Sequence, residues 1–213
     1  MLTAASSPID IYSPTYRLLP THPAATALSD CAAVLDHLLA TNPPNLILAG
    51  SSSGGQLAAL LSQRPGVAVR LAGVLLRGPV TSDAFSGVDP YVPLRFRKWH
   101  TSAVDPSFRN SLLGAMNRAV PRDGLARMPL EAGTEELRGL PRTWIQVCTN
   151  DTLYSDGVCY AMSLEEAGVE VRVDVRVGWP HTFWLRAPGL DEALEAEEEM
   201  VRGLRWLMGE GEN

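Results

Sequence analysis

The stretch NLILAGSSSGGQ, residues 45–56, decides the fold. Residues 45–50 form a short apolar run of the kind found in buried strands, and the run continues through serines and glycines into a helical pattern at residues 56–63. A strand that passes directly into a helix is the repeating unit of a parallel sheet with crossover helices. The same stretch contains GSSSG, residues 50–54, which fits the pattern G-x-S-x-G with Ser52 at its centre.

Short apolar runs and amphipathic stretches of helical length alternate along most of the chain. Residues 79–140 depart from this alternation, since prolines recur there among aromatic and basic residues, and we expect a lid-like insertion over the sheet. The pattern predicts one α/β domain over residues 1–213, with a mostly parallel sheet and flanking helices. Extended segments are expected at residues 9–17, 45–50, 71–76, 143–148 and 171–177, and helices at residues 24–39, 56–63, 155–167 and from residue 190 onward.

The composition is typical of a compact soluble domain. The 213 residues are 46% hydrophobic and 20% charged, which is enough apolar material for a substantial core. Eighteen basic against 24 acidic side chains give a net charge of -6, so there is no positive excess to attract nucleic acid or acidic lipid. No window is apolar for long enough to span a bilayer. We therefore expect no nucleic-acid partner and no membrane span.

The cysteines and the amino terminus favour an intracellular, cytoplasmic protein. Cys31, Cys148 and Cys159 cannot all pair within one chain, and they lack the spacing of a zinc site. The segment MLTAASSPID, residues 1–10, has no basic head followed by an apolar run, as a secretory signal would. Because the sequence also lacks a phosphate loop, a dinucleotide fingerprint and a metal-ligand cluster, we expect no cofactor and no metal.

Ser52 is the candidate nucleophile. Glycines on both sides of the serine would permit a strand-to-helix turn that is too sharp for side chains, and such a turn lifts the serine oxygen above the edge of the sheet. The backbone N–H of Ser53 would then face a developing oxyanion. An ordinary glycine-rich turn that caps a helix is the alternative. The position between a strand and a helix favours the nucleophile.

A serine hydroxyl needs a histidine to accept its proton and a carboxylate to orient that histidine. Asp151 follows the strand at residues 143–148, and His181 follows the strand at residues 171–177, so both belong to the end of a parallel sheet where sites form. Asp156 is the other acid nearby, and its position favours a first-turn helix acid. His22, His37 and His100 have no strand end beside them and are expected to be surface or packing residues.

Several motifs together resemble the α/β-hydrolase fold-3 family, the hormone-sensitive-lipase-like esterases and lipases. YRLLPTHP, residues 16–23, resembles the family's Y-R-L-x-P-x-x-P, and GSSSGG, residues 50–55, resembles its G-D-S-A-G-G turn. GWPHTF, residues 178–183, matches G-x-P-H-x-F, and the order of shorter motifs between these segments also agrees. The resemblance implies an ester hydrolase that forms an acyl-enzyme, with Ser52 as nucleophile, His181 as general base and Asp151 as its orienting acid.

The chain also departs from that family. Ser51 and Ser53 stand where the family usually has aspartate and alanine, and only fifteen residues precede Tyr16, where the family has further strands and an H-G-G-G loop. By the resemblance the fold is N-terminally shortened and lacks half of the oxyanion hole, which costs about 10²- to 10³-fold in turnover. A catalytically silent ligand-binding protein and a fragment of a longer hydrolase are therefore alternatives. Unpaired strand edges make a homodimer possible.

Overall fold

A four-stranded parallel sheet forms the centre of the molecule. The computed structural model describes residues 9–41, 43, 45–84, 91–101 and 121–210. The strand order is β1-β2-β3-β4, and each neighbouring pair is parallel, as the sequence predicts. The strands are β1 (Leu46–Ser51), β2 (Leu71–Arg77), β3 (Thr143–Asn150) and β4 (Val171–Pro180).

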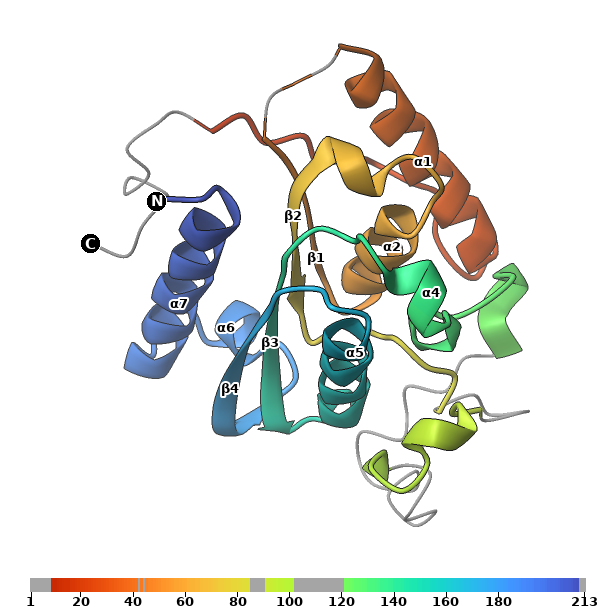
Figure 1. Ribbon diagram of the computed structural model, residues 1–213. Helices are drawn as coiled ribbons and strands as arrows, with labels where there is room; N and C mark the ends of the chain where they lie inside the picture. Colours follow the sequence, from red (N-terminus) through yellow and green to blue (C-terminus); the bar gives the residue numbers. More distant parts are fainter. Residues whose placement is uncertain (1–8, 42, 44, 85–90, 102–120, 211–213) are drawn as a thin grey trace.

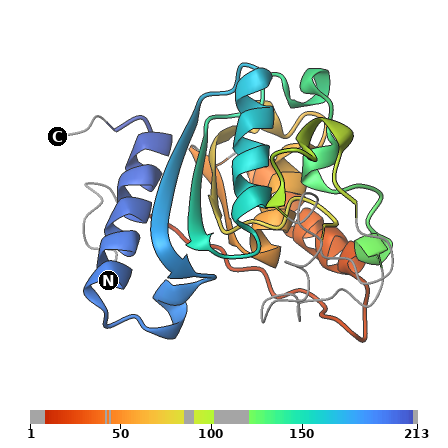
Figure 2. The same cartoon turned by 90° about the horizontal axis from the view of Figure 1, so that it is seen from below.

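Helices cover both faces of the sheet, so the domain has three layers (Figures 1 and 2). Helices α1, α2 and α5 lie on one face, and α7 lies on the opposite face, where the short α6 packs beside it. None of these helices combines the length and apolar character needed to cross a membrane. The α-helices are α1 (Ala24–Thr41), α2 (Ser53–Ser62), α4 (Thr134–Leu137), α5 (Tyr154–Glu166), α6 (Phe183–Arg186) and α7 (Asp191–Leu207), and short 3₁₀ turns cover Ala68–Arg70, Leu94–Phe96, Pro121–Gly124 and Pro129–Glu131.

The alternation of side chains along β2 explains the layers. Val74 and Leu76 point into the main core with α1, α2 and α5. Leu75 points to the other face, where it packs in a smaller cluster with Trp206 and Leu207 of α7. Because successive side chains of a strand point to opposite faces, an unbroken apolar run indicates burial on both faces.

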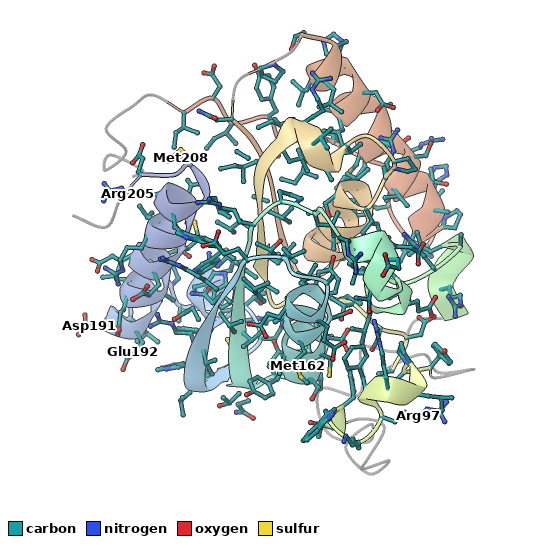
Figure 3. All side chains as sticks on the ribbon, in the orientation of Figure 1. Arg97, Met162, Asp191, Glu192, Arg205 and Met208 are labelled. Carbon is teal, nitrogen blue, oxygen red and sulfur yellow. The ribbon has the colours of Figure 1, made fainter. Side chains whose placement is uncertain are left out.

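The predicted terminal helix is confirmed as α7. Asp191 and Glu192 lie in its first turn and Arg205 in its last turn, which places each charge at the end of the helix that the macrodipole favours (Figure 3). The buried residues Ala193, Ala196 and Gly203 share the side that packs on the sheet.

The extended segment predicted at residues 9–17 does not form a strand. These residues have no regular secondary structure and lie outside the sheet, and the side chains of Ile11 and Tyr12 are 71% and 60% exposed. Alternating polarity favours a strand only where a neighbouring strand supplies the hydrogen-bond ladder, and Pro14 also removes one backbone donor.

The alternating valines of β4 lie on its more exposed face. Val173 and Val175 are about two-fifths exposed because β4 is an edge strand. Asp174 and Arg176, on the other face, pair with each other at 2.7 Å and lie beneath α7. The charged face of this strand is therefore the better covered one.

The segment between β2 and β3 contains short turns and little regular structure. Its described parts include α4 and three 3₁₀ turns, and residues 85–90 and 102–120 lie outside the described residues. The predicted insertion at residues 79–140 falls within this segment.

Candidate active site

Ser52 lies in a strained turn between β1 and α2. Its backbone has φ 56° and ψ -120°, a conformation that is rare for a residue with a side chain. The turn is held because the N–H of Ser52 donates to Arg77 O at 2.9 Å and the N–H of Gln56 donates to Ser52 O at 3.1 Å. The turn thus presents the serine hydroxyl at the carboxyl end of the sheet.

The glycines around Ser52 have different roles. A Cβ on Gly50 would lie 2.1 Å from the carbonyl oxygen of Gly54, so the turn cannot accept a side chain there. Gly54 has open space instead, and Gly55 is the second restricted position, since its Cβ would lie 3.0 Å from Pro79. The expectation that both flanking glycines are required by space is correct for Gly50 and wrong for Gly54.

Asp151 follows β3 and is buried. Its Oδ1 accepts the N–H of Leu153 at 2.9 Å, which fixes the carboxylate at the start of α5. Its Oδ2 is 2.6 Å from Nδ1 of His181. One oxygen is therefore held by the backbone and the other faces the imidazole.

His181 follows β4 and connects the carboxylate to the serine. Its Nε2 lies 2.9 Å from Ser52 Oγ. With the proton on Nδ1, the imidazole donates to Asp151, and Nε2 can accept from the serine hydroxyl. The side chain is 12% exposed, so it is largely enclosed but still reaches the surface of the site. The structure thus brings together the three residues that the sequence analysis selected.

Aromatic packing holds the loop that carries His181. Thr182 has a left-handed backbone, with φ 51°, and turns the chain into α6. Phe183 and Trp184 of α6 are buried, and Phe183 stacks on Trp179 with ring centroids 4.6 Å apart. The partly buried ring of Trp179 before His181 and the buried rings of Phe183 and Trp184 after it restrict the motion of this loop.

Arg77, at the end of β2, contacts both sides of the site. Its carbonyl accepts the N–H of Ser52, and its guanidinium lies 4.0 Å from the ring centroid of Trp184. The same guanidinium donates to Gln146 and Glu197, each at 2.7 Å. This residue therefore joins the turn at Ser52 to the helix that follows His181.

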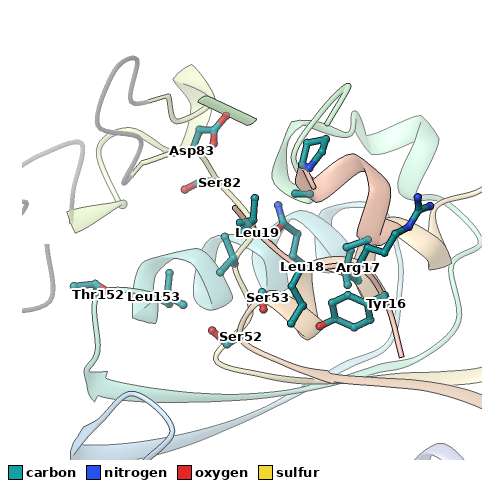
Figure 4. A pocket seen from close by; sticks show the side chains of 16 residues that line it. Tyr16, Arg17, Leu18, Leu19, Ser52, Ser53, Ser82, Asp83, Thr152 and Leu153 are labelled. Carbon is teal, nitrogen blue, oxygen red and sulfur yellow. The ribbon is translucent and has the colours of Figure 1, made fainter. Parts of the chain in front are cut away.

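A cavity of about 410 Å³ opens beside Ser52 (Figure 4). This is within the range of small-molecule sites. The wall is mainly apolar, and Ser52 and Ser53 lie at its base near the segment that contains Tyr16. The lining residues are Tyr16, Arg17, Leu18, Leu19, Pro23, Ala24, Ala27, Ser52, Ser53, Gln56, Leu57, Val80, Ser82, Asp83, Thr152 and Leu153.

The other candidate residues lie apart from this group. His37 is exposed, His22 is half-buried, and His100 is fully buried beside Asp156. Nothing in the sequence links Asp156 with His100, because their contact joins residues 56 positions apart and no motif marks it. Only the first-turn position of Asp156 in α5 was apparent from the sequence.

The cysteines carry free thiols, and all three are buried. Burial raises the pKa of Cys148 and of Cys159 to about 12, and the nearby carboxylates of Asp151 and Asp156 add to the respective shifts. Within the described residues, no group of three or more histidine, cysteine or acidic side chains is placed to hold a metal ion.

Two curated relatives are similar to nearly the whole chain. "FAD-linked oxidoreductase pytB" of Aspergillus terreus is 32% identical over 216 residues, which cover 94% of this chain and 26% of that protein. "Esterase LipU" of Mycobacterium tuberculosis is 30% identical over 220 residues, which cover 96% of this chain and 69% of that protein. The chain therefore spans about a quarter of the first relative and about two thirds of the second.

A solved structure and a family profile agree with these relatives. Vibralactone cyclase superposes with a TM-score of 0.73 at 25% identity, over 92% of this chain and 60% of that chain. A profile of the family described as alpha/beta hydrolase fold matches residues 2–185. The parallel sheet, the strand-to-helix turn at Ser52 and these matches have one explanation: the chain belongs to the α/β-hydrolase fold-3 family.

Proposed function

We propose that this chain is a serine hydrolase that cleaves carboxylic esters through an acyl-enzyme. The observation that carries the proposal is the continuous hydrogen-bonded path from Ser52 Oγ through both nitrogens of His181 to Asp151, with distances of 2.9 and 2.6 Å. A cavity beside the same serine gives a substrate access to it. The esterase name of one relative agrees with this chemistry.

The reaction follows from the positions of these groups. Ser52 Oγ attacks the carbonyl carbon of the ester as its proton passes to Nε2 of His181, and Asp151 stabilises the resulting imidazolium. The N–H of Ser53, at the start of α2, is the proposed donor to the oxyanion. The imidazolium then gives its proton to the departing alkoxide, which leaves as the alcohol. A water molecule, activated by the same imidazole, releases the acid and restores Ser52.

The cavity favours small to medium esters with apolar groups. Tyr16, Leu57 and Leu153 contribute apolar surface near Ser52, and apolar surface gains free energy when it is covered by an acyl or aryl group. We also propose that residues 79–140 form a cap over the sheet, because Val80 and Ser82 of this segment line the cavity. No cofactor or metal enters the proposed reaction.

Ester turnover and active-site labelling test the proposal. Wild-type protein should hydrolyse p-nitrophenyl butyrate and react covalently with a fluorophosphonate, and Ser52→Ala should lose labelling and about 10⁶-fold in kcat. Ser62→Ala is the matched control, because Ser62 is in the same helix segment but its hydroxyl bonds to Ala59 O away from the triad. A folded wild-type protein that binds the ester without turnover or labelling would instead be a silent binding protein.

A further inference from the structure

A second polar cluster lies beside the cavity, around the carboxylate of Asp156. Asp156 is in the first turn of α5, and its side chain is fully buried. Oδ2 accepts the backbone N–H groups of Thr81 at 2.6 Å and Ser82 at 2.9 Å. Oδ1 accepts the Ser82 hydroxyl at 2.7 Å and Nε2–H of His100 at 2.6 Å. Four donors therefore converge on one buried carboxylate.

The donors belong to the wall of the cavity and to the segment that covers it. Val80, Ser82 and Asp83 line the cavity, and Thr81 lies between them. The hydroxyl of Thr81 also donates to the backbone oxygen of Asp156 at 2.8 Å. This part of the wall is thus bonded to the start of α5 by both the side chain and the backbone of Asp156.

His100 and its neighbour bring a third segment to the same place. His100 is buried at the end of the turn that begins at Leu94, and the N–H of Thr101 donates to the Ser155 hydroxyl at 3.0 Å. Since Ser155 precedes Asp156 in α5, the segment around residues 94–101 is bonded to the helix at two adjacent positions.

The hydrogen bonds to Asp156 fix the wall at residues 80–83 and the segment around residues 94–101 against α5. Hydrogen bonds to a carboxylate are shorter and stronger than those between neutral groups. Removal of the carboxylate would leave two buried N–H groups and an imidazole without this acceptor, so the segments would move to find water or other partners. The part of the cavity that would move first is the wall at residues 80–83.

The nucleophile is held by other contacts. Ser52 is fixed by bonds to Arg77 and Gln56, at 2.9 and 3.1 Å, and the bond from Val80 N to Ser52 O is longer, at 3.3 Å. A shift of the wall would therefore change the shape of the cavity more than the position of the serine hydroxyl.

We propose that Asp156, together with His100, is a positioning residue that fixes residues 80–83 and so sets the length of acyl chain that the cavity accepts. This inference rests on the ester hydrolysis proposed above, since it concerns the substrate range of the same site. Asp156 does not touch the reacting atoms. Its effect should appear in discrimination between esters, because rigid walls are what allow a cavity to distinguish chains that differ by a few methylene groups.

Binding measured without turnover is the direct test. In a Ser52→Ala background, the Kd values of p-nitrophenyl acetate and p-nitrophenyl hexanoate are measured by calorimetry. Asp156→Ala should reduce the preference between the two esters by about tenfold, since a displaced wall loses contact with the longer chain. His100→Gln should shift the preference in the same direction but less, and it serves as the second variant if Asp156→Ala does not fold.

Leu164→Ala is the control for lost stability. Leu164 is fully buried in the same helix but does not line the cavity, so this variant should unfold more easily and keep the wild-type preference. The inference is overturned if Asp156→Ala and His100→Gln keep the wild-type preference, if Leu164→Ala changes it equally, or if the cavity binds neither ester.

Turnover by the chain with Ser52 intact separates this inference from the proposed function. A preference that shifts in the Ser52→Ala background supports the role of Asp156 even if the intact chain does not hydrolyse esters. Turnover by the intact chain with an unchanged preference would support the hydrolase and reject the role of Asp156.

Discussion

Two groups in this molecule each contain a serine, a histidine and an aspartate, and they differ in how the imidazole is placed. In the first, His181 lies between its partners, with Nδ1 toward Asp151 and Nε2 toward Ser52. In the second, Nε2 of His100 faces both Asp156, at 2.6 Å, and Ser82, at 3.4 Å.

This difference determines whether the imidazole can accept a proton from the serine or only supports the structure. His181 can accept a proton at one nitrogen while the carboxylate stabilises the other. In the second group Nε2 already donates to Asp156, and the Ser82 hydroxyl donates to the same carboxylate, so Nε2, the nitrogen that faces the serine, cannot take the serine proton. Both groups border the cavity at their serines, but His181 is 12% exposed whereas His100 is fully buried. Residue type alone therefore does not define a catalytic group.

Replacement of the two histidines should give the largest contrast. His181→Ala should lower kcat for p-nitrophenyl butyrate by about 10⁶-fold and change the melting temperature little. His100→Ala should keep kcat within about tenfold but lower the free energy of unfolding by about 1–3 kcal/mol, because the buried Asp156 carboxylate loses a donor. The kcat and the thermal unfolding of both variants are measured to test this contrast. Equal loss of kcat in the two variants would end the distinction between the groups.

Replacement of the two aspartates by asparagine should give the next largest contrast. In Asp151→Asn the amide can donate where the carboxylate only accepted, which favours the wrong tautomer of His181 and should lower kcat about 10⁴-fold. In Asp156→Asn the imidazole of His100 can change tautomer and accept from the new amide, so the cluster should be largely retained. The kcat values of the two asparagine variants are compared, and similar values would contradict this prediction.

Acid should weaken the wall of the cavity to which Arg17 belongs. Arg17 lines the cavity, and its hydrogen bond to Asp30, followed by the bond from its backbone, lowers the pKa of Asp30 from 3.8 to about 2. Because the folded-state value is the lower one, the stabilisation by Asp30 is present above about pH 4 and is lost as the pH falls through about 2. Urea unfolding across this range should show a pH-dependent component that Asp30→Asn lacks. If the wild type and Asp30→Asn show the same pH dependence of urea unfolding, the contribution of Asp30 is excluded.

The smallest effect should be on the two thiols that lie near the aspartates. Burial is the main reason that the pKa values of Cys148 and Cys159 are about 12, and the charges of Asp151 and Asp156 add to it. Asp151→Asn should therefore lower the pKa of Cys148, and Asp156→Asn that of Cys159, and each thiol should react slightly faster with iodoacetamide at alkaline pH. Mass spectrometry of the alkylated cysteines distinguishes the two sites. Slower alkylation in either variant would contradict this prediction.

The sequence predicts most of the sheet because the apolar runs are short and clearly bounded. The runs at residues 45–50, 71–76 and 143–148 correspond to β1, β2 and β3 within a few residues. Residues 9–17 also favour an extended chain, but they pair with no strand of the described residues, and pairing is a property of the whole fold that local alternation does not contain. For the same reason the valines of β4 did not reveal which face would be covered.

The candidate triad was also accessible from the sequence. Ser52, Asp151 and His181 each follow a strand, and the carboxyl ends of parallel strands meet at one edge of the sheet. His100 follows no strand, and its contact with Asp156 depends on how an irregular segment folds back onto α5. Contacts of this kind arise from tertiary packing and leave no periodic signal.

Arg77 contacts both the turn at Ser52 and the helix that follows His181. Strands β1 and β4 are at opposite edges of the sheet, about 14 Å apart at ordinary strand spacing, yet Ser52 and His181 must keep a hydrogen bond between them. The backbone carbonyl of Arg77 accepts the N–H of Ser52, and its guanidinium stacks on the ring of Trp184 in α6, next to His181. When the sheet twists or bends, the side chains of Ser52 and His181 are therefore carried along together, and their alignment does not depend on the rigidity of all four strands.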